Sequence, residues 1–192
     1  LVITSGMAHG QMPQTAEDIA KMKKNNVKRK VQFLNRSADE TLQGDTASIT
    51  TYDKEGRVLS VSNYYYGRVN SELIYSYEGK HLVEMRQKYN GVANTTTKYS
   101  YDSKGNLIKE EWLNRNGTAT GYRQNKYDSR GNKISTQQYA TNGRAQYGEV
   151  FRYNKDNLEI FHAGTNYRGD TTYREYKKWK GNLQIESKYV YQ

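Results

Sequence analysis

The chain has 192 residues, a net charge of +10 at neutral pH and no cysteine, which excludes disulfides and thiolate metal sites. Hydrophobic residues make up only 34% of it, but 19 tyrosines argue against a disordered chain. The positive charge favours acidic partners such as nucleic acid or anionic polysaccharide. Beyond the first ten residues, no apolar run approaches the roughly 18 residues of a transmembrane helix.

Residues 1–10, LVITSGMAHG, carry no charged side chain and place small residues at Ala8 and Gly10. This pattern predicts the end of a secretory signal peptide cleaved after Gly10, and therefore an extracytoplasmic protein. The alternative is a frayed apolar tail. Residues 11–26 are expected to form a short helical cap, in which Thr15 and Asp18 make a capping box and lysines gather at the C-terminal end.

Residues 27–192 show a repeat marked by glycines. One series is Gly56, Gly79, Gly105, Gly131, Asn157 and Gly181, and a second is Gly44, Gly67, Gly91, Gly117, Gly143 and Gly169. Steps within a series are 23 to 26 residues, and the two series interleave at 11 to 14. Turns at this spacing, with alternating segments between them, predict an all-β fold: a long antiparallel β-meander of about 13 short strands, curled or twisted, behind the helix.

The first turn type has a readable chemistry in the segments YDKEG, YDSKG and YDSRG. An aspartate that opens a type I turn accepts hydrogen bonds from the backbone ahead, and the glycine takes the positive φ that starts the return strand. We therefore interpret these residues as structural. They are Asp53, Gly56, Asp102, Gly105, Asp128 and Gly131. A fifth unit has Asn154 and Asn157 in these places, which a turn tolerates and an acid catalyst would not.

An aromatic residue precedes each turn of this series. The members are Tyr52, Tyr77, Tyr101, Tyr127, Tyr153 and Trp179. Strands stacked side by side would bring these rings and the aliphatic residues after each turn into a ladder of cross-strand neighbours. Such a ladder is compatible with the core of the sheet and with a binding face.

These residues resemble the YD repeat of RHS-type proteins. The pattern is clearest at Tyr52–Leu59, Tyr101–Ile108 and Tyr127–Ile134, is degraded at Tyr77, Tyr153 and Trp179, and covers roughly residues 45 to 190. The resemblance implies a curled antiparallel β-strip and an extracytoplasmic setting. Large members of the family wrap such a strip into a shell around a toxin, and others act at cell surfaces, with carbohydrate binding proposed. The resemblance implies no catalytic residue.

Two further segments are rich in aromatic residues: NYYYG is expected to place Tyr64 and Tyr66 on one face of a strand and Tyr65 on the other, and YREYKKWKG mixes aromatic with basic residues. Such mixtures suit stacking on sugars or bases with an anion alongside, although a solvated sheet face gives the same pattern. The candidate ligand-binding residues are Tyr64, Tyr66, Tyr173, Tyr176, Lys177, Lys178 and Trp179.

No catalytic, metal or cofactor site is predicted. Glu110 and Glu111 are adjacent in a strand and should point to opposite faces, and His81 and His162 lie in different units without metal-ligand spacing. We therefore expect a non-catalytic binding or scaffold module that presents a Tyr/Lys/Arg-rich face to an anionic polysaccharide or a protein. A glycan-active enzyme and a nucleic-acid binder are the alternatives, and an unpaired last strand near Tyr189–Tyr191 would allow self-association.

Overall fold

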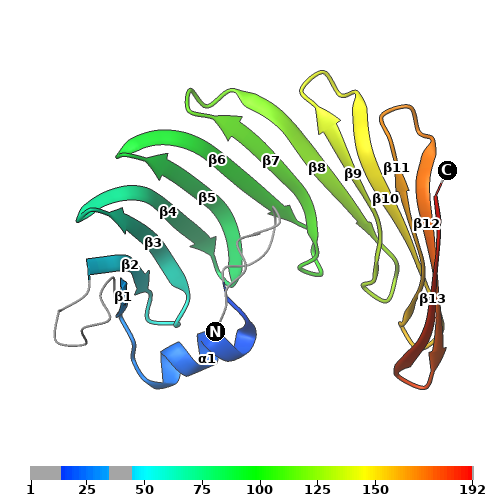
Figure 1. The fold of residues 1–192 in the computed structure, drawn as a ribbon, viewed down its shortest axis with the longest axis horizontal. Coiled ribbons are helices and arrows are strands. Elements are labelled where there is room, and N and C mark those ends of the chain that lie inside the picture. The colour runs from blue at the N-terminus through cyan, green and yellow to red at the C-terminus, as the bar shows by residue number, and fades with distance from the viewer. Residues whose placement is uncertain (1–13, 35–44, 192) are drawn as a thin grey trace. The chain divides into compact units, whose positions relative to one another are not determined.

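A computed structural model describes residues 14–34 and 45–191, so the predicted signal-peptide segment lies outside the described residues. It contains one helix followed by thirteen strands in a single antiparallel sheet, with strand order equal to chain order (Figure 1). The all-β meander predicted from the turn spacing is confirmed. The elements are α1 (Ala16–Lys24), β1 (Arg29–Leu34), β2 (Asp45–Tyr52), β3 (Val58–Tyr65), β4 (Arg68–Glu78), β5 (His81–Tyr89), β6 (Val92–Tyr101), β7 (Leu107–Asn114), β8 (Ala119–Tyr127), β9 (Lys133–Ala140), β10 (Ala145–Tyr153), β11 (Glu159–Thr165), β12 (Thr171–Lys180) and β13 (Leu183–Tyr191).

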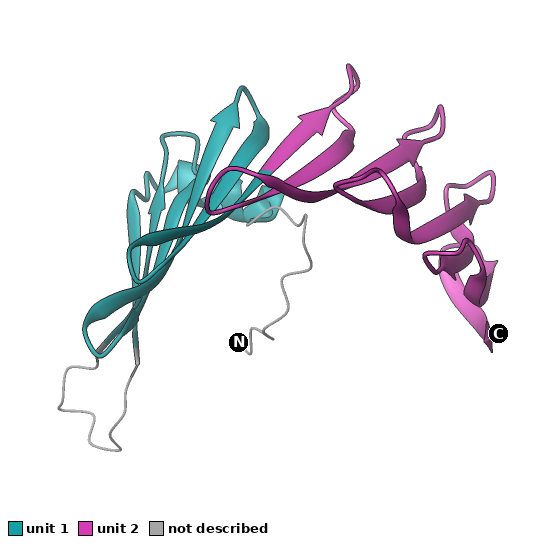
Figure 2. Ribbon diagram, turned by 90° about the horizontal axis from the view of Figure 1, so that it is seen from above, with its two compact units in different colours: residues 1–97 teal, residues 98–192 magenta. Residues whose placement is uncertain are grey.

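The chain divides into two compact units, residues 1–97 and 98–192, which Figure 2 shows in different colours. Unit 1 holds α1 and the strands up to β5, together with the first part of β6. Unit 2 holds the end of β6 and the strands from β7 to β13.

Helix α1 begins with the predicted capping box. The Thr15 hydroxyl accepts from the Asp18 amide at 3.1 Å, and the Thr15 amide donates to the Asp18 carboxylate at 3.2 Å. The helix packs on the β2–β3 turn of unit 1, where the Gln14 side chain donates to the Gly56 carbonyl at 3.0 Å and accepts from the Val58 amide at 2.7 Å. The helix therefore covers the turn of the β2–β3 hairpin.

Five of the six ladder aromatics follow a register shift between their strand and the next. Shifts occur immediately before Tyr52, Tyr77, Tyr127, Tyr153 and Trp179. One extra residue on the return strand re-aims the strand after the turn, which is the effect of a β-bulge. The repeat thus encodes a bulged hairpin, not a plain one.

The ladder side chains clasp consecutive repeats together. The hydroxyls of Tyr77, Tyr127 and Tyr153 each donate, at 3.0 Å, to the backbone carbonyl that lies two residues after the glycine position of the preceding turn. Trp179 makes the equivalent bond through its indole N–H, to the Glu159 carbonyl at 2.8 Å. These rings hold the sheet together, so the ladder belongs to the core of the repeat. We call the sheet face that carries it the tyrosine face.

Candidate binding face

The YD aspartates lie in the turns as hydrogen-bond acceptors. Oδ1 of Asp102 accepts from the amides of Lys104 at 2.9 Å and Asn106 at 2.8 Å, and Oδ2 accepts from the Asn106 side chain at 2.9 Å. These bonds, chiefly that from the Asn106 side chain, hold the pKa of Asp102 below its ordinary value. Asn154 reproduces the two backbone bonds, to the amides of Asp156 at 2.9 Å and Leu158 at 3.0 Å. The role therefore needs an acceptor oxygen and not an acid.

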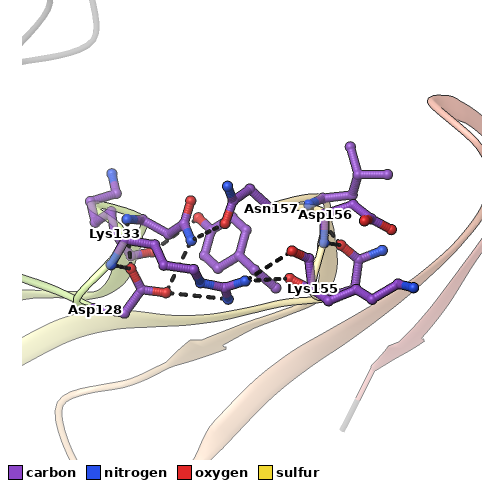
Figure 3. A network of polar contacts seen from close by, with 10 residues as sticks. Asp128, Lys133, Lys155, Asp156 and Asn157 are labelled. Carbon is purple, nitrogen blue, oxygen red and sulfur yellow. Dashed lines mark hydrogen bonds and ion pairs between the residues drawn. The ribbon is translucent and has the colours of Figure 1, made fainter.

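Neighbouring turns of unit 2 also bond to one another (Figure 3). Nη1 of Arg130 donates to the Asn154 carbonyl at 2.9 Å and to the Lys155 carbonyl at 3.3 Å. The Asn132 side chain bridges Asp128, at 3.0 Å, and Asn157, at 3.0 Å. The side chains of Arg130 and Asn132 therefore hold two neighbouring turns together.

The structure separates the two tyrosines of the NYYYG segment. Tyr64 lies in β3, but β3 ends at Tyr65. Tyr66, with a φ of 47°, forms a two-residue turn together with Gly67. The expectation that Tyr64 and Tyr66 share one strand face is therefore wrong, because the chain reverses before strand alternation reaches Tyr66. The ring of Tyr66 instead meets that of Tyr65, with centroids 4.5 Å apart.

Strand alternation in β12 divides the second predicted cluster between the two faces of unit 2. Tyr173, Lys177 and Trp179 are on the tyrosine face, together with the buried Glu175. Tyr176 and Lys178 point to the opposite face and are exposed. The residues predicted to form one site in β12 therefore lie on two opposite faces of the sheet and cannot contact the same ligand.

On the opposite face, an aromatic row crosses four strands with a cation at each end. Arg152 of β10 pairs across the sheet with Phe161, Phe161 with Tyr176, and Tyr176 with Lys188 of β13. The Arg152 guanidinium lies 4.9 Å from the Phe161 centroid, and the Phe161 and Tyr176 rings meet edge to face at 5.3 Å. Sequence reasoning missed Arg152, Phe161 and Lys188, because nothing in the chain shows that these three residues come into register with Tyr176.

More positive charge flanks this row. Arg174 lies between Ala163 and Val190 on the same face, and Lys178 pairs with Glu186 at 2.7 Å. We call Arg152, Phe161, Arg174, Tyr176, Lys178 and Lys188 the basic-aromatic face. Lys180 of β12 shares this face, so within the described strands β10 to β13 five cations stand against the carboxylate of Glu186.

The tyrosine face of the same strands carries the acids. His162 is stacked on Phe151 at 4.6 Å between centroids, and its Nε2 lies 3.2 Å from Glu149 Oε1 and 2.9 Å from the Tyr173 hydroxyl. Glu175 is 5% exposed and accepts from the Ser187 hydroxyl at 2.7 Å. Burial would raise the pKa of Glu175, but the bonds from Ser187 and Tyr189 and the Lys177 charge lower it overall.

Glu159, His162 and Glu175 place one ligand atom each within 4.8 Å of the others, a spacing that a metal ion could use. The Lys177 ammonium lies in this group, 2.5 Å from Glu159 Oε1 and 3.4 Å from Glu175 Oε2. The ammonium forms ion pairs with both carboxylates. Burial would lower the pKa of Lys177, but these two carboxylates raise it overall. The cluster is accounted for as an ion-pair network, and sequence spacing had given no signal of it.

The adjacent glutamates of β7 also separate as predicted. Glu110 is 2% exposed and pairs with Arg123 at 3.3 Å, whereas Glu111 pairs with Lys109 at 2.9 Å. They face opposite sides of the sheet and cannot act together on one substrate. Within the described ranges, no helix is long and apolar enough to cross a membrane.

No protein-family model matches the chain, and no curated protein matches it. Among solved structures, it is similar to TcdB2-TccC3 without its hypervariable C-terminal region, at TM-score 0.45 and 14% identity over 85% of this chain and 10% of that chain. A porin-like protein from Bacteroides uniformis follows at TM-score 0.33 and 12% identity, over 80% of this chain and 51% of that chain. TarM is similar at TM-score 0.26 and 9% identity, over 81% of this chain and 25% of that chain.

This chain therefore spans about a tenth of the length of the TcdB2-TccC3 chain. At these identities and TM-scores, the similarities carry no argument about family or function. Membership in the YD-repeat family stays a prediction based on the motif.

Proposed function

We propose that this protein is an extracytoplasmic, non-catalytic module of the YD-repeat kind that binds an anionic polysaccharide through the basic-aromatic face. The row Arg152–Phe161–Tyr176–Lys188 is the observation that carries the proposal. The extracytoplasmic setting rests on the apolar, small-residue pattern of residues 1–10 and on the YD motif.

The row combines the two interactions that a charged sugar polymer needs. The apolar side of a pyranose packs on an aromatic ring, and carboxylate or sulfate groups pair with Arg and Lys. Neighbouring strands lie about 4.8 Å apart, so the four side chains span about 14 Å, a length that suits an extended polymer better than one small anion.

The division of charge between the two faces also supports a directed interaction. In β10 to β13, the carboxylates of Glu149, Glu159 and Glu175 lie on the tyrosine face, and the cations of the row lie on the other. A general surface charge would be spread over both faces. This division leaves the basic-aromatic face as the attractive side for a polyanion.

The proposal that the module is non-catalytic rests on the partners that the carboxylates of β10 to β12 already have. A glycosidase needs a pair of carboxyl groups that face one cleft with room for a sugar. Glu159 and Glu175 share the Lys177 ammonium instead, and Glu149 is bonded to His162. We expect no release of reducing ends from a bound polyuronate. Hydrolysis that a Glu149→Gln or Glu175→Gln change abolishes would contradict this part.

The binding proposal is tested by calorimetry of the purified chain with polygalacturonate, dextran sulfate and uncharged dextran. We expect the two polyanions to bind in a salt-sensitive way and dextran not to bind. Arg152→Gln, Lys188→Gln and Tyr176→Ala should each weaken binding about 5- to 10-fold, which is about 1 to 1.4 kcal/mol. Lys104→Gln removes the same charge from a turn of unit 2 and should change the affinity less than about twofold.

Two results would overturn the proposal. An equal loss in Lys104→Gln would mean that overall charge alone drives binding. Tighter binding of single-stranded oligonucleotides than of any polysaccharide, with the same response to Tyr176→Ala, would favour nucleic-acid binding through the same face.

A further inference from the structure

A second surface with binding chemistry lies in unit 1, at the turn between β3 and β4. Tyr66 and Gly67 form a two-residue turn with φ values of 47° and 72°. The next turn at this end of the unit, Asn90-Gly91, has almost the same geometry, with φ values of 48° and 77°. Asn-Gly is the usual choice for such turns, because asparagine tolerates the left-handed region and bulky residues do not.

Tyr66 therefore occupies a position where the same unit elsewhere uses the favourable residue. A bulky side chain with positive φ is a strained choice that architecture alone does not explain, since Asn90 builds the same turn without it. The ring is also not used for burial, because Tyr66 is 69% exposed and its partner Tyr65 is 61% exposed. The two rings meet at 77° and form a corner open to solvent.

This corner is one wall of a hollow of about 400 Å³. The other lining residues are Arg68, Val69, Asn70 and Asn90. Arg68 pairs with Tyr65 directly across the hairpin, and Asn70 is the extra residue of a bulge in β4. A bulge of this kind re-aims a side chain, and the backbone N–H of Asn90 donates to the Asn70 carbonyl at 2.8 Å, which ties the Asn90-Gly91 turn to this bulge in β4. A volume of this size is in the range of small-ligand sites.

The polar groups of the hollow have hydrogen-bonding capacity to spare. Within residues 14–34 and 45–191, the guanidinium of Arg68 and the side-chain amides of Asn70 and Asn90 make no hydrogen bond or ion pair with one another or with other residues. A guanidinium presents a planar fork of donors that matches a carboxylate, and an amide matches a pair of hydroxyls. Two rings, one fork and two amides are complementary to a pyranose that carries a carboxylate.

We propose that this hollow, which we call the Tyr66 hollow, binds an acidic sugar residue of a glycan. The ring of the sugar would pack on Tyr65 and Tyr66, its carboxylate would pair with Arg68, and its hydroxyls would bond to Asn70 and Asn90. The inference goes beyond the proposed function, because its residues lie in unit 1 and share none with the basic-aromatic face. Each can fail while the other holds.

The test is a titration of the full chain with a trimer of galacturonic acid and with the neutral galactose trimer, followed by NMR chemical shifts or calorimetry. We expect the acidic trimer to bind at least ten times more tightly than the neutral one. Tyr66→Asn gives this turn the same Asn-Gly sequence as Asn90-Gly91, so the melting temperature should stay the same or rise. The same change should weaken binding of the acidic trimer at least tenfold. Arg68→Gln should remove the preference for the acid.

Two controls separate this site from other surfaces. Tyr167→Asn alters another exposed turn tyrosine and should leave the titration unchanged. Arg152→Gln alters the basic-aromatic face, where an acidic trimer can also bind, so the control follows the NMR shifts of Arg68 and Asn70, and their titration curves should not change. The inference is overturned if Tyr66→Asn binds the acidic trimer like the original chain, if both trimers bind equally, if neither binds, or if inorganic phosphate competes better than galacturonate.

Discussion

A Gly56→Ala substitution tests how the helix is attached to the sheet. Gly56 sits in the β2–β3 turn at φ +82°, and an added Cβ would lie 2.4 Å from the Ile19 carbonyl oxygen and 2.6 Å from the Lys23 backbone nitrogen. Both atoms belong to the backbone of α1 and cannot move aside alone. The substitution therefore forces the whole helix away from the turn.

The expected loss has two parts. An L-residue in the left-handed region costs about 1–2 kcal/mol at any such turn. Displacing α1 also removes the two Gln14 bonds, to the Gly56 carbonyl and the Val58 amide, at about 1 kcal/mol each. The exposed Lys23–Glu55 pair adds at most about 0.5 kcal/mol. Gly56→Ala should thus destabilise unit 1 by about 3–4.5 kcal/mol.

Two glycines supply matched controls. Gly67 is in the same unit at φ +72°, and Gly131 occupies the same YD-motif position in unit 2 at φ +88°; neither has an atom within 4 Å of an added Cβ. Alanine at either should cost only the backbone part. The measurement is urea unfolding together with hydrogen exchange of residues 14–26. An equal loss at all three glycines, or unchanged exchange of α1 in Gly56→Ala, would refute the reasoning.

Three further predictions concern unit 2. Tyr153→Phe removes the hydroxyl that donates to the Lys133 carbonyl, and it should cost about 1 kcal/mol in urea unfolding; no loss would show that the clasp is dispensable. The pKa of Asp102 is lowered by folding, so its contribution is present above its ordinary pKa, near 3.9, and is lost as the pH falls through the folded value. Asp102→Asn keeps the acceptor oxygen, and its melting temperature should therefore fall less between pH 5 and pH 3 than that of the original chain; parallel curves would contradict this. Lys177→Met leaves Glu175 buried without its cation and should cost about 2–4 kcal/mol, which a second Glu175→Gln change partly restores; a stable single variant would contradict the ion-pair reading.

The turns were predictable because their chemistry is local. The Asp102 carboxylate accepts from donors within four residues of it, and the substitution pattern at Asn154 and Asn157 already separates a turn from a catalytic carboxylate. The capping box of Thr15 and Asp18 is equally short-range. The positive-φ glycine predicts a G1 bulge at the turn itself, but the register shift beside the ladder aromatics was not predictable, because it depends on how two strands pair.

The tyrosines were harder because one residue type serves three purposes. Tyr153 is a clasp, Tyr176 is part of an exposed row, and Tyr66 stands in a strained turn. Sequence alternation could assign Tyr176 to the face opposite Tyr173, but it misplaced Tyr66 because the strand ends one residue earlier. A comparison of Tyr66-Gly67 with Asn90-Gly91 was the available signal for that turn.

The sequence by itself determined the meander, its strand number and its turn chemistry, since a residue about every twelve positions that favours a reversal leaves no room for another fold. Only the tertiary structure decided which side chains meet. The row from Arg152 to Lys188 and the network around Lys177 join residues from different strands, and their meeting depends on register. A shift of one residue in any pairing would move every side chain of a strand to the other face, so the two faces of unit 2 exist only once all its strands are paired.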